Sequence, residues 1–267
     1  MAESKSPTRS RSPKGEKSPP RAGSAARPAR RGARSPTRSA YTRAEVEAIF
    51  ARFEARDPEP RGELLYVNPY TLLVAVALSA QATDVGVNKA TRGLFAEATT
   101  PQEMVALGED RVREHIRTIG LYRNKAKNVI ALSRALIADH GGEVPCDREA
   151  LQALPGVGRK TANVVLNIAF GVPAIAVDTH IFRIANRIGL APGKTPDAVE
   201  AHLEKVIPAR YKLHSHHWLI LHGRYVCKAR KPDCAACLIA DLCKSPEKTL
   251  AEPYETASPA ARRAVAT

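Results

Sequence analysis

Four cysteines near the C-terminal end are the residues whose types and spacing most clearly predict chemistry. Cys227, Cys234, Cys237 and Cys243 are separated by six, two and five residues and lie within 17 positions. Four thiolates this close together can enclose a metal centre. The spacing differs from the paired C-x2-C units of zinc ribbons and from the C-x2-C-x2-C-x3-C run of bacterial ferredoxins. On spacing alone, a [4Fe–4S] cluster is favoured moderately over zinc.

Disulfide bonds are the alternative use of these cysteines. Two disulfides within a short segment are typical of small secreted domains. This chain has 267 residues and an odd total of five cysteines, and its first residues do not resemble a signal peptide. The fifth cysteine, Cys146, lies outside the cluster spacing and is interpreted as a spare thiol. A metal centre is therefore the favoured interpretation.

A second group of chemically informative residues lies in the segment LPGVGRKTA, residues 154–162. A short helix is predicted before it, over residues 147–153, and an apolar helix after it, over residues 161–170. Gly156 and Gly158 in the turn between them would let the backbone approach a phosphate closely, with the amides of the second helix facing the anion. An ordinary corner between two helices is the alternative, but the whole segment favours a helix-hairpin-helix.

Lys160 and Asp178 could form a reactive pair. A lysine in the first turn of a helix opposes the positive end of the helix dipole, a placement that favours an unprotonated, nucleophilic amine. Asp178 is predicted to be the N-cap of the next helix. Its carboxylate could also stabilise a developing cation or accept the proton of Lys160.

The elements that must position these residues are predicted to be helices, so the expected fold is all-α. Thr42 is a plausible N-cap ahead of an acidic first turn, Asn68 and Pro69 open an apolar helix, and Pro101 starts another helix. A further helix is predicted over residues 124–140, after a loop at 118–122. No segment shows the sustained alternation of a strand. The longest apolar run, residues 72–78, is too short to span a membrane.

The charge of the chain is concentrated at its N-terminal end. Residues 1–40 contain 11 Lys and Arg against 2 Glu, a net charge of +9 out of +14 for the whole chain. They contain no Val, Ile, Leu or aromatic residue, so we expect a disordered basic tail. Such a tail would bind nucleic acid loosely in a salt-dependent way, or would serve only as a solubilising linker.

Five motifs and the four cysteines together resemble the endonuclease III family, the bifunctional DNA glycosylases/AP lyases of the helix-hairpin-helix glycosylase superfamily. The resemblance covers residues 41 to 253 and leaves out the basic tail. The motifs are LSAQATD (78–84), TIGLY (118–122), LPGVGRKTANVVLN (154–167), VDTHIFR (177–183) and HHWLILHGR (216–224), followed by the cysteines at 227–243.

The resemblance implies two helical lobes with a DNA-binding cleft between them. Residues 66–173 would form a six-helix barrel lobe, with the helix-hairpin-helix at about 147–170. Residues 41–65 would join residues 174–253 in the second lobe, which carries the iron–sulfur segment 227–243. Residues 254–267 would be a disordered C-terminal tail.

The resemblance also implies the chemistry of the site. Lys160 would attack C1′ of a flipped-out nucleotide, expel an oxidised or ring-saturated pyrimidine and form a Schiff base, and β-elimination would then cut the strand 3′ to the lesion. Asp178 matches the essential carboxylate. Gln81 matches the residue that fills the vacated space in the duplex, Leu121 a residue inserted into the opposite strand, and His180 a cleft-lining position.

The four cysteines match the ligands of the family's [4Fe–4S] cluster. Lys228, Arg230 and Lys231 lie between the first two of them, so the cluster would hold a cationic loop toward DNA phosphates. The expected partner is double-stranded DNA with damaged pyrimidines or abasic sites, bound by a monomer and not at a membrane. A bacterial cytoplasm or nucleoid is the expected compartment.

Two alternatives remain open at this stage. One is a monofunctional adenine or mismatch glycosylase of the same superfamily, although Lys160 argues against it. The other is a non-catalytic DNA-binding iron–sulfur protein, which would leave the pair of Lys160 and Asp178 unexplained. Gln152 departs from the family pattern, which has glutamate at this position, and this puts in doubt any proton relay through that side chain.

Overall fold

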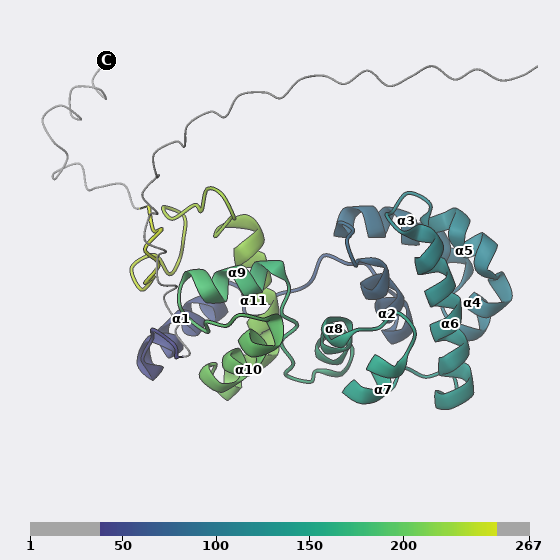
Figure 1. The fold of residues 1–267 in the computed structure, drawn as a ribbon, viewed down its shortest axis with the longest axis horizontal. Coiled ribbons are helices and arrows are strands. Elements are labelled where there is room, and N and C mark those ends of the chain that lie inside the picture. Colours follow the sequence, from purple (N-terminus) through teal and green to yellow (C-terminus); the bar gives the residue numbers. More distant parts are fainter. Residues whose placement is uncertain (1–37, 250–267) are drawn as a thin grey trace, which may run out of the picture. The chain divides into compact units, whose positions relative to one another are not determined.

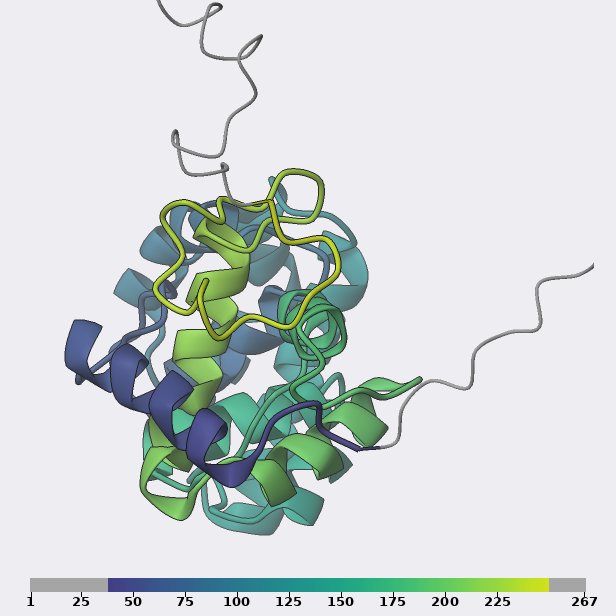
Figure 2. The same ribbon diagram turned by 90° about the vertical axis from the view of Figure 1, so that its left-hand side faces the viewer.

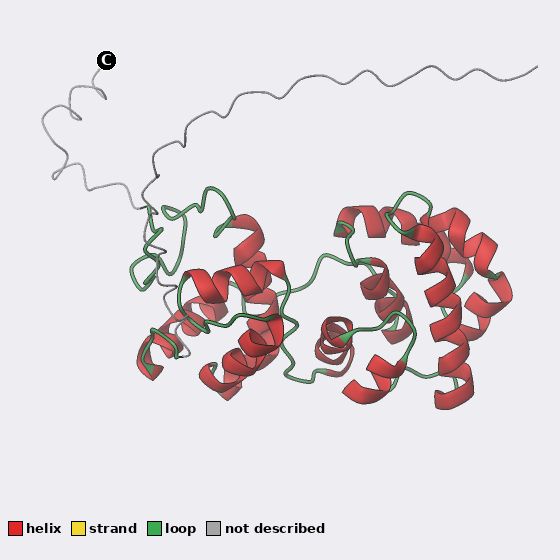
Figure 3. Ribbon diagram, viewed as in Figure 1, coloured by secondary structure: helices red, strands yellow, loops and turns green. Residues whose placement is uncertain are grey.

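The computed structural model describes residues 38–249, and all regular elements in this range are helices (Figure 1, Figure 3). The all-α prediction is confirmed. The predicted tails, 1–40 and 254–267, lie outside the described residues except for residues 38–40, where the Ala40 amide donates to the Gly189 carbonyl at 2.8 Å. The α-helices are α1 (Arg43–Arg56), α2 (Pro69–Leu78), α3 (Asp84–Glu97), α4 (Pro101–Leu107), α5 (Glu109–Ile116), α6 (Tyr122–His140), α7 (Arg148–Ala153), α8 (Arg159–Phe170), α9 (Thr179–Arg187), α10 (Pro196–Val206) and α11 (Lys212–Tyr225), with a 3-10 turn η1 (Ala209–Tyr211) before α11.

Local capping chemistry determines where several helices begin. Thr42, Asn68 and Thr100 each accept a hydrogen bond from the backbone three residues ahead and complete a capping box. Proline at the first position of α2 and α4 has the φ angle that a helix requires. These three starts are confirmed. The helix predicted to begin at residue 124 begins earlier, at Tyr122, because Leu121 acts as its N-cap in a left-handed conformation.

The first lobe is built from α2 to α8. Helices α4 and α5 pack on α6, α3 packs on α5, and α2 and α7 pack on α8. The buried residues of its hydrophobic core lie between Tyr70 and Ala174, and the partly buried Leu64 packs against them. Burial of these apolar side chains is the main force that holds the helices together. Leu73, Met104, Leu132 and Leu151 are among its fully buried members.

The second lobe joins α1 to α9, α10 and α11, although α1 precedes the first lobe in sequence (Figure 2). Aromatic rings make this contact. Phe53 stacks on Trp218 with ring centroids 6.3 Å apart, and Phe50 stacks on Tyr211 at 5.8 Å. The Trp218 indole N–H donates to the Asp57 carbonyl at 2.7 Å, so this buried polar group is satisfied.

Side chains of α8 connect the two lobes. Asn163 donates to the Ile175 carbonyl at 3.2 Å, and Asn167 donates to the carbonyls of Ala174 at 3.2 Å and Leu213 at 2.8 Å. Arg159 makes a forked ion pair with Glu200 of α10, with nitrogen–oxygen distances of 2.7 and 3.0 Å. The Glu200 carboxylate is buried, so its pairing with a guanidinium offsets the cost of taking a charge out of water.

Among the described residues, no helix is long and apolar enough to cross a membrane.

Candidate active site and cluster site

The turn between α7 and α8 has the geometry of a phosphate-binding hairpin. Gly156 has φ +78°, and a Cβ at this position would lie 2.8 Å from the side-chain nitrogen of Asn128. Both the backbone conformation and the lack of space for a side chain therefore require glycine. Gly158 is the N-cap of α8 and offers no side-chain hydrogen bond, and the first turn of α8 carries no acidic residue. The first amides of α8 are therefore free to bind an anion.

Lys160 is the second residue of α8 and is exposed. The sequence had predicted the helix from residue 161, and it begins two residues earlier, at Arg159, because Gly158 caps it through its extended backbone alone. Lys160 lines a cavity with an empty volume of about 540 Å³, open solvent included. The walls come from both lobes and include Ser79, Asp84, His216 and Arg224. An amine on this wall can reach a group that enters the cavity.

Asp178 is the last residue of the extended segment between α8 and α9, which a side chain of α8 holds by a hydrogen bond. Its carboxylate accepts from the amides of His180 at 2.9 Å and Ile181 at 2.8 Å, which confirms the predicted N-cap of α9. The extended segment that ends at Asp178 is held by Asn163, one turn after Lys160 on the same helix face. The second oxygen of the Asp178 carboxylate makes no hydrogen bond with the described residues. It is therefore available to contact a substrate.

His216 is buried beside Lys160 and lines the same cavity. Burial, together with the smaller effects of the charges of His217, Lys160 and Arg224, lowers the pKa of His216 to about 3, so the ring is neutral at physiological pH. It hydrogen-bonds to the backbone at Ala176, and its Nδ1 has no partner among the described residues. The ring therefore fixes the segment before Asp178.

An ion-pair group closes another side of the cavity. Arg224 of α11 contacts Asp84 at the start of α3 at 2.5 Å, and it also pairs with Glu63. Tyr225 donates to the same Glu63 carboxylate. These contacts join the second lobe to the first beside Lys160. These contacts could not be predicted from the sequence, because Arg224 and Asp84 are far apart along the chain.

Gln81 and Leu121 are the non-glycine residues of the described chain with positive φ, at 57° and 59°. The left-handed region is unfavourable for residues with a Cβ, and such strain is concentrated at functional sites. Both side chains are exposed, and Leu121 is 60% exposed despite being apolar. These are the two residues predicted from sequence to enter the duplex. Residue type alone does not predict the strained backbone at these two positions.

The four cysteines line one cavity, with an empty volume of about 410 Å³, open solvent included. All four are free thiols, so the disulfide alternative is wrong for these residues, and Cys146 is a separate exposed thiol as predicted. The described residues contain no set of three or more His, Cys, Asp or Glu side chains close enough to hold one metal ion. Four cysteines around one cavity are the donor set that holds an iron–sulfur cluster.

The chemistry of this donor set also fits a cluster. Burial, together with the smaller effects of the nearby thiols of Cys243, Cys227 and Cys234, raises the pKa of the Cys237 thiol to about 11. Four such thiolates repel one another unless a positively charged centre lies between them. Iron supplies that charge.

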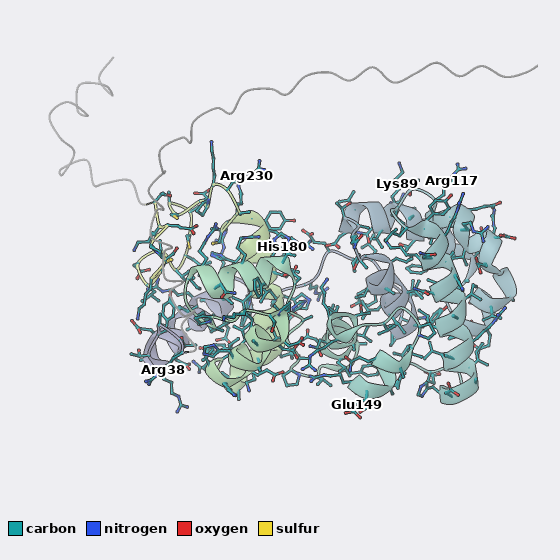
Figure 4. The ribbon with its side chains drawn as sticks, viewed as in Figure 1. Arg38, Lys89, Arg117, Glu149, His180 and Arg230 are labelled. Atoms are coloured by element: carbon teal, nitrogen blue, oxygen red, sulfur yellow. The ribbon has the colours of Figure 1, made fainter. Side chains whose placement is uncertain are left out.

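The cationic loop between Cys227 and Cys234 is closed at its base. The amides of Lys228 and Asp233 both donate to the Val226 carbonyl, each at 2.9 Å. Lys228, Arg230 and Lys231 are all exposed, and Figure 4 shows Arg230 extending away from the loop. The loop therefore presents cations to solvent from a backbone held by hydrogen bonds.

Some residues singled out in the sequence lie elsewhere. Asp178, Gln81 and Leu121 are not among the walls of the Lys160 cavity. His180 is half-buried in the first turn of α9, and Gln152 is half-buried on α7. Residues 192–195 lie in the turn between α9 and α10.

Comparison with known proteins agrees with this geometry. The model of the HhH-GPD superfamily of base excision DNA repair proteins matches residues 74–209, and the model of the iron–sulfur binding domain of endonuclease III matches residues 227–243. The endonuclease III of Treponema pallidum is 59% identical over 74% of this chain and 94% of its own length. That of Escherichia coli K12 is 59% identical over 75% of this chain and 95% of its own length.

Among solved structures, a trapped endonuclease III–DNA covalent intermediate matches with a TM-score of 0.71 and 45% identity, over 76% of this chain and 96% of its own. The fold and the site are those of a base excision repair DNA glycosylase that carries a [4Fe–4S] cluster. The chain belongs to the endonuclease III family, whose members are DNA glycosylases with AP lyase activity.

Proposed function

We propose that this protein excises oxidised or ring-saturated pyrimidines from double-stranded DNA, with Lys160 as the nucleophile and Asp178 as the carboxylate that assists it. The amine of Lys160 attacks C1′ of the flipped nucleotide, and the base leaves with its bonding electron pair. The resulting Schiff base then undergoes β-elimination, which breaks the strand on the 3′ side. Flipping is needed because C1′ of a stacked nucleotide is inaccessible.

The observation that carries this proposal is the position of Lys160. It follows an uncapped helix start, where free amides can hold a phosphate, and it faces a cavity with walls from both lobes. Asn163 on the same helix holds the segment that ends at Asp178. A phosphate bound at the hairpin would place the neighbouring nucleotide beside the amine. The covalent DNA intermediate of a relative supports the same chemistry.

Two sets of side chains would bind the duplex in this proposal. Gln81 and Leu121 project from strained, exposed turns and would fill the space that the flipped nucleotide leaves. Gly156, Gly158, Lys228, Arg230 and Lys231 would contact phosphates, which position the protein without reading sequence. His180, half-buried next to Asp178, would line the cleft.

The [4Fe–4S] cluster has a structural role in this proposal. Cys227, Cys234, Cys237 and Cys243 would ligate it, and the bound cluster supplies a rigid, charged centre around which the segment folds. Because two of its ligands flank the cationic loop, the loop loses little conformational entropy when it binds DNA. Base chemistry is assigned to Lys160 and Asp178 and not to the cluster.

We also propose that the protein acts as a monomer at the bacterial nucleoid. All residues assigned to catalysis and DNA contact come from one chain, and the similar curated proteins are bacterial. Free thiols and an iron–sulfur centre are most stable in reducing surroundings.

Borohydride trapping on a duplex with one thymine glycol tests the proposal. The expected result is a covalent protein–DNA band on a denaturing gel, and strand cleavage when borohydride is left out. The matched duplex without the lesion should give neither.

Alkali-sensitive abasic sites without a covalent band would show a monofunctional glycosylase and would contradict the role of Lys160. If neither product forms on thymine glycol or dihydrouracil, the lesion class is wrong. We expect an adenine mismatch duplex to remain intact, and excision of its adenine instead would show an active enzyme of another lesion class.

A further inference from the structure

Arg187 connects the last turn of α9 to the cluster segment. Its Nη1 lies 3.7 Å from Cys227 Sγ and 2.6 Å from the Lys228 carbonyl, and its Nη2 donates to the Ala229 carbonyl at 2.7 Å. Its Nε lies 2.9 Å from a carboxylate oxygen of Glu247, and the side chain is only 12% exposed. All three guanidinium nitrogens are engaged, so the charge is held in place against the sulfur.

His222 of α11 makes a similar contact with a second cysteine. Its Nε2 lies 3.6 Å from Cys237 Sγ, and its ring is 5% exposed and packs edge-on against Phe53, with centroids 5.3 Å apart. A ligating cysteine is a thiolate and can only accept a hydrogen bond. Nε2 must therefore carry the ring proton and donate to the sulfur.

We propose that Arg187 and His222 are tuning residues that set the reduction potential of the [4Fe–4S] cluster through N–H···S hydrogen bonds to Cys227 and Cys237. Hydrogen bonds to the sulfurs, net charge and solvent exposure control the potential of such clusters. Reduction adds one electron to the cluster, and donors directed at its sulfurs stabilise that electron. Both residues thus raise the potential, and Arg187 raises it more because it is a cation that is shielded from solvent.

This inference depends on the cluster and on its cysteine ligands, and not on the roles of Lys160 or Asp178. Outer-sphere partners of this kind orient ligands and tune a metal centre. The sequence does not identify them, because Arg187 lies 40 residues from Cys227 and His222 lies 15 residues from Cys237.

The test is the midpoint potential of the cluster in the full-length, cluster-loaded protein, measured by voltammetry. One electron passes between the electrode and the cluster, and no bond is broken. Arg187→Gln should lower the potential by about 59 mV, which corresponds to a tenfold change in the one-electron equilibrium constant. His222→Phe, which keeps a ring of similar size, should lower it by a smaller amount.

Arg52→Gln is the matched control. Arg52 also lies beside the cluster segment, where it binds Asp241 and the Leu238 carbonyl, but it contacts no cysteine. It removes the same charge from a more exposed position and should shift the potential clearly less than Arg187→Gln. Equal shifts for the two arginine variants would mean that only charge matters and would overturn the proposal, as would a wild-type potential in Arg187→Gln.

If Arg187→Gln loses the cluster during purification, its midpoint potential cannot be measured. Arg187→Lys is then measured instead. Lysine keeps the charge, but one nitrogen cannot bind the sulfur and two carbonyls together. A lowered potential in Arg187→Lys and His222→Phe would support the proposal, and wild-type potentials in both would refute it. Trapping of lesion DNA is measured in parallel, so that a failure of the proposed catalytic roles is seen separately.

Discussion

Lys160→Ala is expected to abolish borohydride trapping and to lower single-turnover excision by about 10³-fold or more, the scale seen when a nucleophile is removed. The amine nitrogen is the atom that attacks C1′ in the proposed reaction, and no other lysine of the described residues lines the cavity. The change should leave the fold intact, because Lys160 is exposed and alanine is favourable in a helix. Lesion DNA should still bind, since the hairpin amides are backbone groups.

Lys194→Ala serves as the control for Lys160→Ala. Lys194 is exposed in the turn between α9 and α10, so its removal changes the net charge equally without touching the cavity. It should trap DNA like the wild-type protein. A covalent band that persists in Lys160→Ala would show that another amine is the nucleophile.

Asp178→Asn is expected to separate two roles of one side chain. Asparagine caps helices about as well as aspartate, so the hydrogen bonds to His180 and Ile181 are retained and the free energy of unfolding should change by less than about 1 kcal/mol. Loss of the charge should lower single-turnover excision by about 10²- to 10⁴-fold. Urea unfolding and excision measured on the same preparation give both numbers.

Asp178→Ala is the companion variant. It removes the cap as well as the charge and should cost a further ~0.5–2 kcal/mol of stability. Wild-type excision by Asp178→Asn would mean that Asp178 only caps α9, and the catalytic carboxylate would have to be sought elsewhere in the cleft.

Helix starts were predictable where a side chain forms the cap. Thr42, Asn68, Thr100 and Asp178 each satisfy backbone donors two or three residues ahead, so the signal lies within a few positions of sequence. The start of α8 was placed two residues late because Gly158 caps through backbone conformation, which leaves no mark on residue type.

Contacts between distant parts of the chain could not be predicted in this way. The ion pair between the exposed Arg159 and the buried Glu200 joins residues 41 positions apart, and Asn167 reaches Leu213 across 46. Helical periodicity predicts which face of each helix is apolar, but not which polar residue of another helix it will meet.

Some features of the candidate site could be predicted from the sequence, and others could not. The cluster ligands follow from the cysteine spacing alone, with the family resemblance deciding the cluster type. The strained backbone at Gln81 and Leu121, the neutral His216 beside Lys160 and the sulfur contacts of Arg187 and His222 follow only from the three-dimensional arrangement. The assignments of Lys160 and Asp178 stay predictions until they are tested.

The order of the chain has a consequence for how the protein is made. The first core is complete once residue 174 has been synthesised, whereas α1 must wait for Trp218 and Ile239 before its apolar face is covered. Because domains fold as their residues become available, the lobe with Lys160 should form first. Protection of the Leu132 amide before the Phe50 amide, in hydrogen exchange of nascent chains stalled at increasing lengths, would show this order. A nascent chain would thus contain its proposed nucleophile before its cluster ligands have been synthesised. Cleavage of DNA would then begin only after the segment with the cluster ligands, residues 227–243, has been made.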